Sequence, residues 1–188
     1  MKAFITKSPY LITFFILLII KPFLYGLLIP KKEIILNSFN INNYTYGNIL
    51  YQNPYKFNEE FVIAIDDDLV KINDYVINEK GLLGIVSKKY HNMAIVKMLT
   101  SKDFLLQVQI SNCYGLLKNS LITNVDAHCD IKKGDIVYTS NLYYVKEIVK
   151  IGTISKVIKD ENNIADSFEI SFFNNEIIPE EVLVIGDK

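Results

Sequence analysis

The sequence predicts a mainly β protein, with an N-terminal transmembrane helix followed by two small antiparallel β-barrel modules. Three observations lead to this fold class: a long apolar segment near the N-terminus, period-2 alternation through most of the remaining chain, and a short phrase that occurs twice. The predicted divisions are 1–9 as a cytoplasmic tip, 10–29 as the transmembrane helix, 30–47 as a short connector, 48–122 as the first barrel module and 123–188 as the second.

The apolar segment, YLITFFILLIIKPFLYGLLI, has one charge in twenty positions, about the length that crosses a bilayer as a helix. No small-x-small cleavage site follows it, so we expect an uncleaved anchor. Lys21 is unfavourable there, because a lysine near mid-bilayer costs about 2.5 to 3.5 kcal/mol. Three interpretations stay open. The helix begins near Phe4 and Lys21 snorkels to the interface, Lys21 faces a partner's transmembrane helix beside a kink at Pro22, or the segment does not span.

The lysines that flank this segment favour a cytoplasmic N-terminus only weakly, since Lys2 and Lys7 precede it and Lys31 and Lys32 follow it. We therefore expect a single-pass protein of the cell membrane with the bulk of the chain outside the cytoplasm. Beyond residue 30 the chain holds 17 lysines and all 21 acidic residues, a net charge of 17 − 21 = −4. This mildly acidic body argues against binding to the phosphate backbone of nucleic acid.

Strand patterns dominate from residue 48 onward. The segment EFVIAI places Phe61, Ile63 and Ile65 on one face, and LLQVQI and SFEISF alternate in the same way. Such alternation puts one face of a strand in a core and the other in water. Turns such as NEKG, TSKD and KDENN separate the strands, which is typical of small antiparallel barrels or sandwiches.

The repeated phrase is GIVSKK at Gly84–Lys89 and GTISKV at Gly152–Val157. Before each copy stands a residue able to adopt a left-handed backbone, Asn73 or Gly134, followed directly by an aspartate and a hydrophobic run. We interpret this as two related β modules, while chance similarity between strands of similar composition is the alternative. The glycine that opens each copy predicts a bulge or a sharp bend, and close approach of a ligand is the less favoured interpretation.

The polar residues show no motif typical of catalysis. His128 lies between Asp126 and Cys129, but no paired spacing supports a metal site. The run Asp66 to Asp68 lacks the alternating ligands of a calcium loop, and no serine occurs in a G-x-S-x-G context. We therefore predict no catalytic residue, cofactor or metal, and a protein that binds other proteins rather than an enzyme.

The two cysteines, Cys113 and Cys129, lie sixteen positions apart. They could pair if the body lies outside the membrane, but spacing alone does not show this. We expect two buried free thiols instead.

Five short phrases occur in an order that is specific as a set. Gly81–Val86 resembles "GLVGRV", Leu99–Asp103 stands where "LTDP" is expected, Gly134–Leu142 resembles "GDLVVTSGL", Ile151–Val157 resembles "IGTVTEV", and Glu180–Ile185 resembles "LEEVLVV". These are phrases of the rod-shape-determining protein MreC family of bacteria, which this sequence resembles over residues 48 to 185.

The resemblance implies a non-catalytic scaffold of cell elongation that organises peptidoglycan synthesis. Its implied partners are an MreD-like membrane protein, a class B penicillin-binding transpeptidase and, indirectly, the MreB filament. Lys21 and Pro22 would then contact a neighbouring transmembrane helix. The family-motif positions in turns and strands are Gly81, Gly84, Gly134, Asp135, Thr139, Ser140 and Gly152.

This chain also departs from the family pattern. Its connector is too short for the usual long coiled coil, so self-association as a homo-oligomer stays open. Asn141 replaces the glycine of "TSGL". The alternative function from another class is a membrane-anchored adaptor of a transport or secretion system, and a membrane-bound enzyme comes third.

Overall fold

A computed structural model describes most of the chain after residue 43. The described residues are 44–52, 59–65, 69–142, 145, 147–159, 166–174 and 181–186. The predicted transmembrane helix, including Lys21 and Pro22, lies outside them. Within the described residues, no helix is long and apolar enough to cross a membrane.

The described residues form β-strands, in agreement with the predicted mainly β class. The strands are β1 (Tyr44–Gln52), β2 (Glu60–Ile65), β3 (Tyr75–Asn78), β4 (Gly81–Tyr90), β5 (Met93–Met98), β6 (Leu105–Ile110), β7 (Cys113–Lys118), β8 (Leu121–Thr123), β9 (Ile136–Thr139), β10 (Lys150–Ile158), β11 (Ser167–Phe172) and β12 (Glu181–Ile185).

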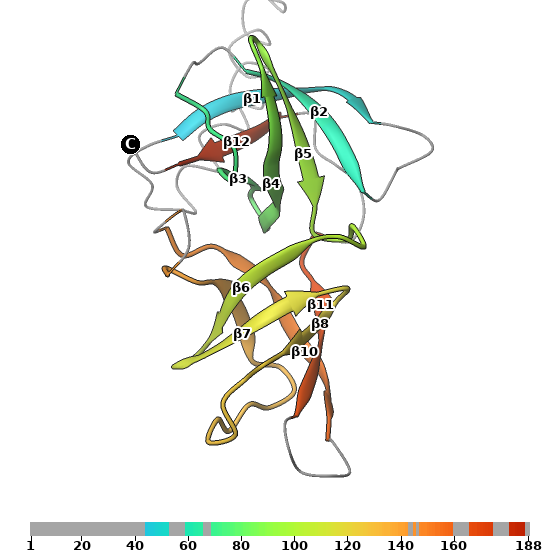
Figure 1. Cartoon of the computed structure of the whole chain (residues 1–188), viewed down its shortest axis with the longest axis vertical. Coiled ribbons are helices and arrows are strands. Elements are labelled where there is room, and N and C mark those ends of the chain that lie inside the picture. Colours follow the sequence, from blue (N-terminus) through green and yellow to red (C-terminus); the bar gives the residue numbers. More distant parts are fainter. Residues whose placement is uncertain are drawn as a thin grey trace, which may run out of the picture. The chain divides into compact units, whose positions relative to one another are not determined.

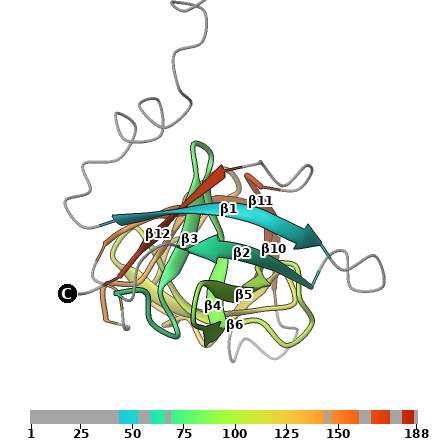
Figure 2. The ribbon, with the colours of Figure 1, turned by 90° about the horizontal axis from the view of Figure 1, so that it is seen from above.

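These strands close into two antiparallel barrels of six strands each, which confirms the two predicted barrels (Figure 1). The ring of the first barrel is β1-β12-β3-β4-β5-β2, and the ring of the second is β7-β6-β9-β10-β11-β8. In the ring β12 lies between β1 and β3, and seen from above it crosses the line of β1 (Figure 2). Closure leaves neither barrel with a free sheet edge.

The predicted boundary between residues 122 and 123 is wrong. Strands β6 and β7 precede that boundary and β8 straddles it, yet all three belong to the second barrel, and β12 follows it but completes the first barrel. β12 pairs with β1 and β3 from the far end of the chain, for example Ile185 with Tyr44 and Leu183 with Ile77. The predicted connector also ends too late, because β1 begins at Tyr44. Alternation identifies a strand, but it does not identify the strand's partner.

The two barrels are copies of one arrangement, which confirms the predicted duplication. Their rings match strand for strand, so that β3 corresponds to β9, β4 to β10 and β5 to β11. The register matches as well, because Gly84 pairs with Met98 in β5 and Gly152 pairs with Phe172 in β11. β12 occupies in the first barrel the place that β6 occupies in the second.

The match extends to an irregularity inside the repeated phrase. The pairing of β4 with β5 shifts at Ser87, and that of β10 with β11 shifts at Ser155. Each serine hydroxyl donates a hydrogen bond to a carbonyl oxygen of the neighbouring strand, that of Ile95 or Glu169, at 3.0 Å in both barrels. A β-bulge of this kind increases the local bend and twist that a small closed barrel needs.

The core of the first barrel consists of the inward side chains of its strands. The alternation predicted for EFVIAI is confirmed, because Phe61, Ile63 and Ile65 are all buried in this core. The full cluster is Phe61, Ile63, Ile65, Val70, Val76, Leu83, Val86, Ala94, Val96, Met98, Val182 and Val184. Burying an aliphatic or aromatic side chain of this size contributes about 1.5 to 3 kcal/mol.

The expectation of two free thiols is wrong, because Cys113 and Cys129 form a disulfide with their Cα atoms 6.2 Å apart. Cys113 begins β7, and Cys129 lies in the segment that connects β8 to β9. That segment folds back so that the two cysteines meet while both stay partly exposed. The sixteen-residue spacing of the two cysteines could not show that the segment after β8 folds back to Cys113.

Candidate protein-binding surface

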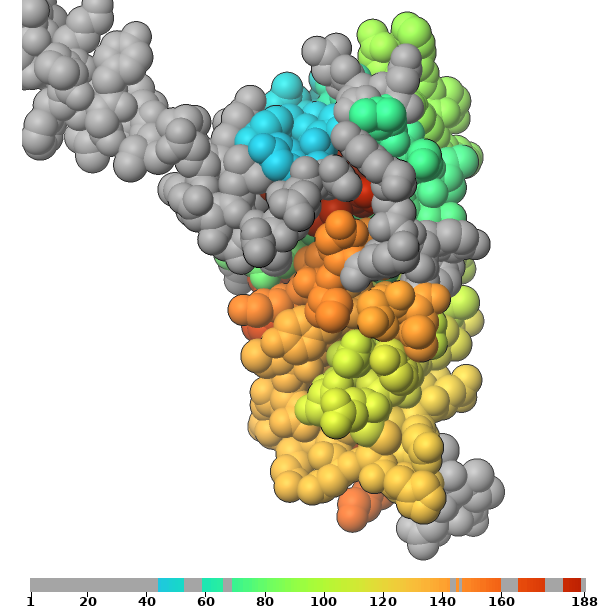
Figure 3. All heavy atoms as spheres, turned by 90° about the vertical axis from the view of Figure 1, so that its left-hand side faces the viewer, coloured from blue at the N-terminus to red at the C-terminus, as the bar shows by residue number. Residues whose placement is uncertain are grey.

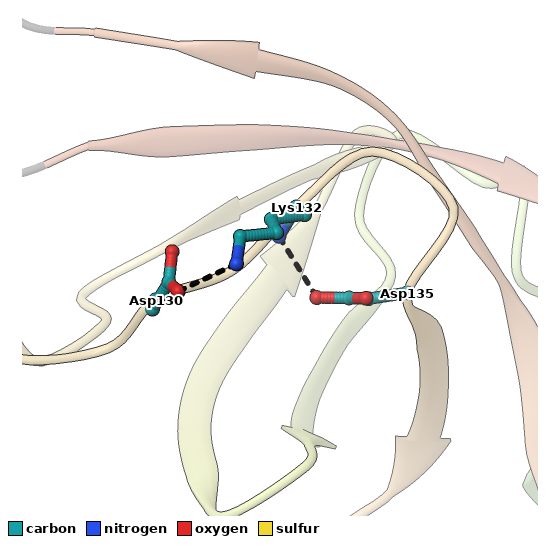
Figure 4. A network of polar contacts seen from close by, with 3 residues as sticks. All are labelled: Asp130, Lys132 and Asp135. Carbon is teal, nitrogen blue, oxygen red and sulfur yellow. Dashed lines mark hydrogen bonds and ion pairs between the residues drawn. The ribbon is translucent and has the colours of Figure 1, made fainter.

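The family-motif residues Gly134 and Asp135 build a turn before β9. The Asp135 carboxylate accepts a hydrogen bond from the Lys132 backbone N–H at 2.8 Å, and the Lys132 ammonium contacts Asp130 at 2.7 Å (Figure 4). Gly134 has φ +97°, and its N–H donates to the Ile154 carbonyl at 2.8 Å. These contacts fasten the turn to β10, so both residues have a structural role.

The ion pair at this turn has an electrostatic signature. A hydrogen bond to the Asp130 side chain, followed by the charges of Asp130 and Asp135, raises the pKa of Lys132 above its ordinary value of 10.5. The Lys132 and Asp130 side chains are 71% and 80% exposed, so water screens the pair. It is therefore a surface contact rather than a reactive site.

The first barrel repeats this turn with different residues. Asn73 has φ +77°, and its N–H donates to the Val86 carbonyl at 2.8 Å. The Asp74 carboxylate accepts a hydrogen bond from the Lys71 N–H at 2.7 Å. The left-handed backbone predicted at Asn73 and Gly134 is therefore confirmed.

The repeated glycines, Gly84 and Gly152, are sites of close backbone packing. A Cβ on Gly84 would lie 2.1 Å from the Lys97 carbonyl oxygen, and one on Gly152 would lie 2.2 Å from that of Ser171. Both glycines are buried, and both carbonyls belong to the adjacent strand of the same barrel. This geometry agrees with the predicted sharp bend and leaves no room at either glycine for a ligand.

Thr139 and Ser140 are completely buried and organise the segment after β9. The Thr139 hydroxyl donates to the Glu147 carbonyl at 3.1 Å and accepts from the Val149 N–H at 2.9 Å. The Ser140 hydroxyl accepts from the Leu142 N–H at 3.1 Å. Neither hydroxyl is placed to act as a nucleophile on a molecule from solution.

The polar cluster around His128 does not form a metal site in the described part of the chain. No group of three His, Cys, Asp or Glu side chains there is arranged to hold a metal ion. His128 is exposed, and Cys129 is bonded to Cys113. The described residues around His128 therefore have no arrangement typical of a reactive site.

A largely apolar face covers the outside of β7, β6 and β9 in the second barrel. Gln107 pairs with Leu116, and Gln109 lies between Tyr114 and Tyr138, so these outward side chains are neighbours. We call this the open face. Its members are Leu105, Gln107, Gln109, Tyr114, Leu116, Ile136 and Tyr138, and none of them carries a charge. In Figure 3 the yellow-green spheres around β6 lie uncovered in the middle of the side shown.

The open face is exposed and hollowed. Leu105 is 49% exposed, and Tyr114 and Ile136 are each 38% exposed. A hollow of about 310 Å³ lies over β6 and β7, lined by Leu105, Gln107, Tyr114 and Leu116 together with their neighbours and bordered by Asn124. It is large enough to accept one or two side chains of another protein.

The corresponding face of the first barrel is buried instead. By register Tyr75 corresponds to Ile136 and Ile77 to Tyr138, yet Tyr75 and Ile77 are 0% exposed. Leu183 and Ile185 of β12 also point away from the barrel core and are also 0% exposed. The fold therefore covers this face in one barrel and leaves it uncovered in the other.

Sequence reasoning missed the open face. The alternation of LLQVQI predicted its buried side correctly, because Leu106, Val108 and Ile110 are buried. One residue could have indicated the open face. Leu105 is apolar, yet the two-residue period of the strand places it on the same outward side as Gln107 and Gln109.

Comparison with known families decides what this pair of barrels is. The pattern described as "Rod shape-determining protein MreC, barrel core" matches residues 49–186. This chain belongs to the MreC family. The family is described as one that determines rod shape. A search of curated proteins found no match.

Solved MreC structures share the fold. MreC from Listeria monocytogenes has a TM-score of 0.70 at 22% identity, with 90% of each chain covered. MreC from Pseudomonas aeruginosa has a TM-score of 0.60 at 20% identity, covering 77% of this chain and 99% of that one. A complex between PBP2 and MreC from Helicobacter pylori has a TM-score of 0.60 at 14% identity, covering 78% of this chain and 99% of that one.

Proposed function

We propose that this MreC-family protein is a membrane-anchored, non-catalytic scaffold that organises peptidoglycan-synthesis enzymes during cell elongation. The observation that carries the proposal is the open face, an uncharged and hollowed surface on a barrel that the family shares. Depletion of charge together with exposed tyrosines is typical of the core of protein interfaces.

The proposed occupant of the open face is a class B penicillin-binding transpeptidase. The solved complex of PBP2 with MreC from Helicobacter pylori supports a partner of this class. Lys118 pairs with Leu105 and Lys150 with Tyr138, so lysines stand at two edges of the face. In a body of net charge −4, these lysines favour a partner whose apolar contact is bordered by acidic residues.

The proposed location is the cell membrane, with residues 10–29 as a single-pass anchor, the N-terminus in the cytoplasm and the barrels outside. The Cys113–Cys129 disulfide supports this orientation, because disulfides persist mainly in oxidising compartments outside the cytoplasm. On the cytoplasmic side, the N-terminal tip would be linked to the MreB filament only indirectly. An MreD-like membrane protein would contact the helix near Lys21 and Pro22.

The test is photo-crosslinking in the native membrane with a benzophenone amino acid at Tyr114. The matched control is the same substitution at Tyr90, a tyrosine that is 53% exposed on β4 of the first barrel. We expect a transpeptidase to be captured from position 114 and not from position 90.

Capture of transporter subunits from position 114 would favour the adaptor function and contradict the proposal. Capture of the transpeptidase from position 90 alone would keep the scaffold function but move its binding surface to the first barrel. The variant Leu116→Lys should abolish the crosslink, because burying an unpaired charge in an apolar contact typically costs about 2 kcal/mol or more.

A further inference from the structure

A pair of asparagine side chains connects the two barrels. The Asn78 side-chain amide, at the end of β3, donates to the Asn174 side-chain oxygen at 2.8 Å. The Asn174 amide in turn donates to the Leu82 carbonyl in β4 at 2.9 Å. Asn174 follows β11, and the N–H of its neighbour Phe173 donates to the Ile151 carbonyl, so this segment is fixed to the second barrel.

Asn78 also closes the turn from which it reaches across. Its side-chain oxygen accepts hydrogen bonds from the N–H groups of Lys80 at 2.9 Å and Gly81 at 3.2 Å. The residue is only 5% exposed. Its oxygen therefore holds the β3–β4 turn in shape, while its nitrogen bonds to the second barrel. The two ends of one side chain have separate roles.

The same turn touches the second barrel through its backbone. Gly81 has φ +135°, a conformation that favours glycine, and a Cβ there would lie 2.3 Å from the Lys150 carbonyl oxygen at the start of β10. No side chain larger than hydrogen fits between the turn and β10 in this arrangement. The turn therefore sits directly against the backbone of the other barrel.

Comparison of the two barrels shows that only the first uses this position to contact the other barrel. Thr139 stands in the second barrel at the position of Asn78, and it too is buried and polar. The Thr139 hydroxyl bonds to Glu147 and Val149, between β9 and β10 of its own barrel. The Asn78 side chain is longer than that of Thr139, so it can close its own turn and also reach the other barrel.

We propose that the β3–β4 turn and Asn174 form a fastener that holds the two barrels in one fixed orientation. The fastener consists of the Asn78–Asn174 and Asn174–Leu82 hydrogen bonds and the close approach of Gly81 to Lys150. These contacts are made by side chains and by the β3–β4 turn, and they are additional to the chain crossings that connect the barrels. The fastener does not depend on what the protein binds.

Two substitutions remove hydrogen bonds between the barrels while keeping the hydrogen bonds inside the β3–β4 turn. Asn78→Asp keeps the oxygen that accepts from Lys80 and Gly81 but loses the donor to Asn174. Asn174→Ala removes both inter-barrel hydrogen bonds and leaves the β3–β4 turn untouched. Asn92→Ala is the matched control, because Asn92 is an exposed asparagine in the β4–β5 turn.

The measurement is the distribution of electron spin distances between labels at His91 in the first barrel and Lys156 in the second, both exposed, in the full chain in detergent micelles. The labels are attached to noncanonical amino acids, so the disulfide cysteines are not disturbed. We expect one narrow distribution for the unaltered chain and for Asn92→Ala, and a clearly broader one for Asn78→Asp and Asn174→Ala.

Equal widths in all four proteins, or a broad distribution in the unaltered chain, would overturn the proposal. Hydrogen exchange tests the same idea where a variant folds poorly. In Asn174→Ala, release of the fastener should speed exchange of the Asn78 side-chain amide protons, which donate to Asn174, about tenfold, the usual scale for one lost buried hydrogen bond, and should leave the Ile154 amide inside the second barrel unchanged. Equal acceleration at both amides would mean general unfolding and would contradict a local fastener.

Discussion

Replacing Gly84 by alanine should be one of the most destabilising methyl additions in the protein. The new Cβ would lie 2.1 Å from the Lys97 carbonyl oxygen, whereas ordinary contacts begin at 3.4 Å. The two atoms would therefore have to separate by about 1.3 Å. Because the obstacle is backbone in β5 rather than a flexible side chain, β4 and β5 would have to move apart where they pair.

The expected cost lies at the upper end of overpacking, about 3 kcal/mol. For a chain of this size that corresponds to a melting temperature lower by about 10 °C. Thermal and urea unfolding of the full chain in detergent, followed by far-ultraviolet circular dichroism, measures both. Gly152→Ala should behave alike in the second barrel, where the equivalent distance is 2.2 Å.

The control for this prediction is Gly47→Ala in β1. Its nearest neighbours would be side-chain atoms, of Val182 at 3.2 Å and Ile63 at 3.3 Å, which can shift by a few tenths of an ångström. We expect a cost below about 1 kcal/mol. If Gly84→Ala proved no more destabilising than Gly47→Ala, the close-approach explanation of the repeated glycines would be refuted.

Three further predictions concern the β8–β9 segment and its turn. Replacing Cys113 and Cys129 together by serine should lower the free energy of unfolding by about 3 kcal/mol, the scale for a loop of this length, and a reductant should then have no further effect on the variant. Asp130→Asn should leave that free energy essentially unchanged, because the ion pair is exposed and screened by water, yet an NMR titration should show the pKa of Lys132 fall back toward 10.5. The raised pKa also sets the sign of the pH dependence: the small contribution of this pair is present at neutral pH and is lost as the pH rises above 10.5. Asp135→Ala removes the acceptor for the Lys132 N–H and should cost about 1 kcal/mol, measured by urea unfolding.

The features that sequence reasoning predicted are local ones. The alternation of Phe61, Ile63 and Ile65 depends only on the two-residue period of a strand. The turns at Asn73 and Gly134 depend on residues that tolerate positive φ. Because the same local pattern occurred twice, it also predicted that one fold was duplicated, and the matching bulges at Ser87 and Ser155 bear this out.

The features that it missed depend on distant parts of the chain. Nothing near Glu181–Ile185 indicates that this strand completes the first barrel, and nothing near Cys129 indicates that its segment returns to Cys113. The open face was missed for a related reason. Leu105 and Ile136 are ordinary strand residues, and only the paired arrangement of their strands shows that they stay uncovered.

The placement of β12 has a consequence for the order in which the protein assembles. About 80 residues separate the end of β5 from the start of β12, so at synthesis rates of about 5 to 20 residues per second the first barrel waits several seconds for its last strand. The second barrel is contiguous from β6 to β11 and can close meanwhile. During that interval β1 and β3 present unpaired edges, the state in which a nascent chain is most exposed to aggregation and to chaperones. A stop codon just before residue 181 would therefore damage the barrel made first, while the barrel made second would remain intact.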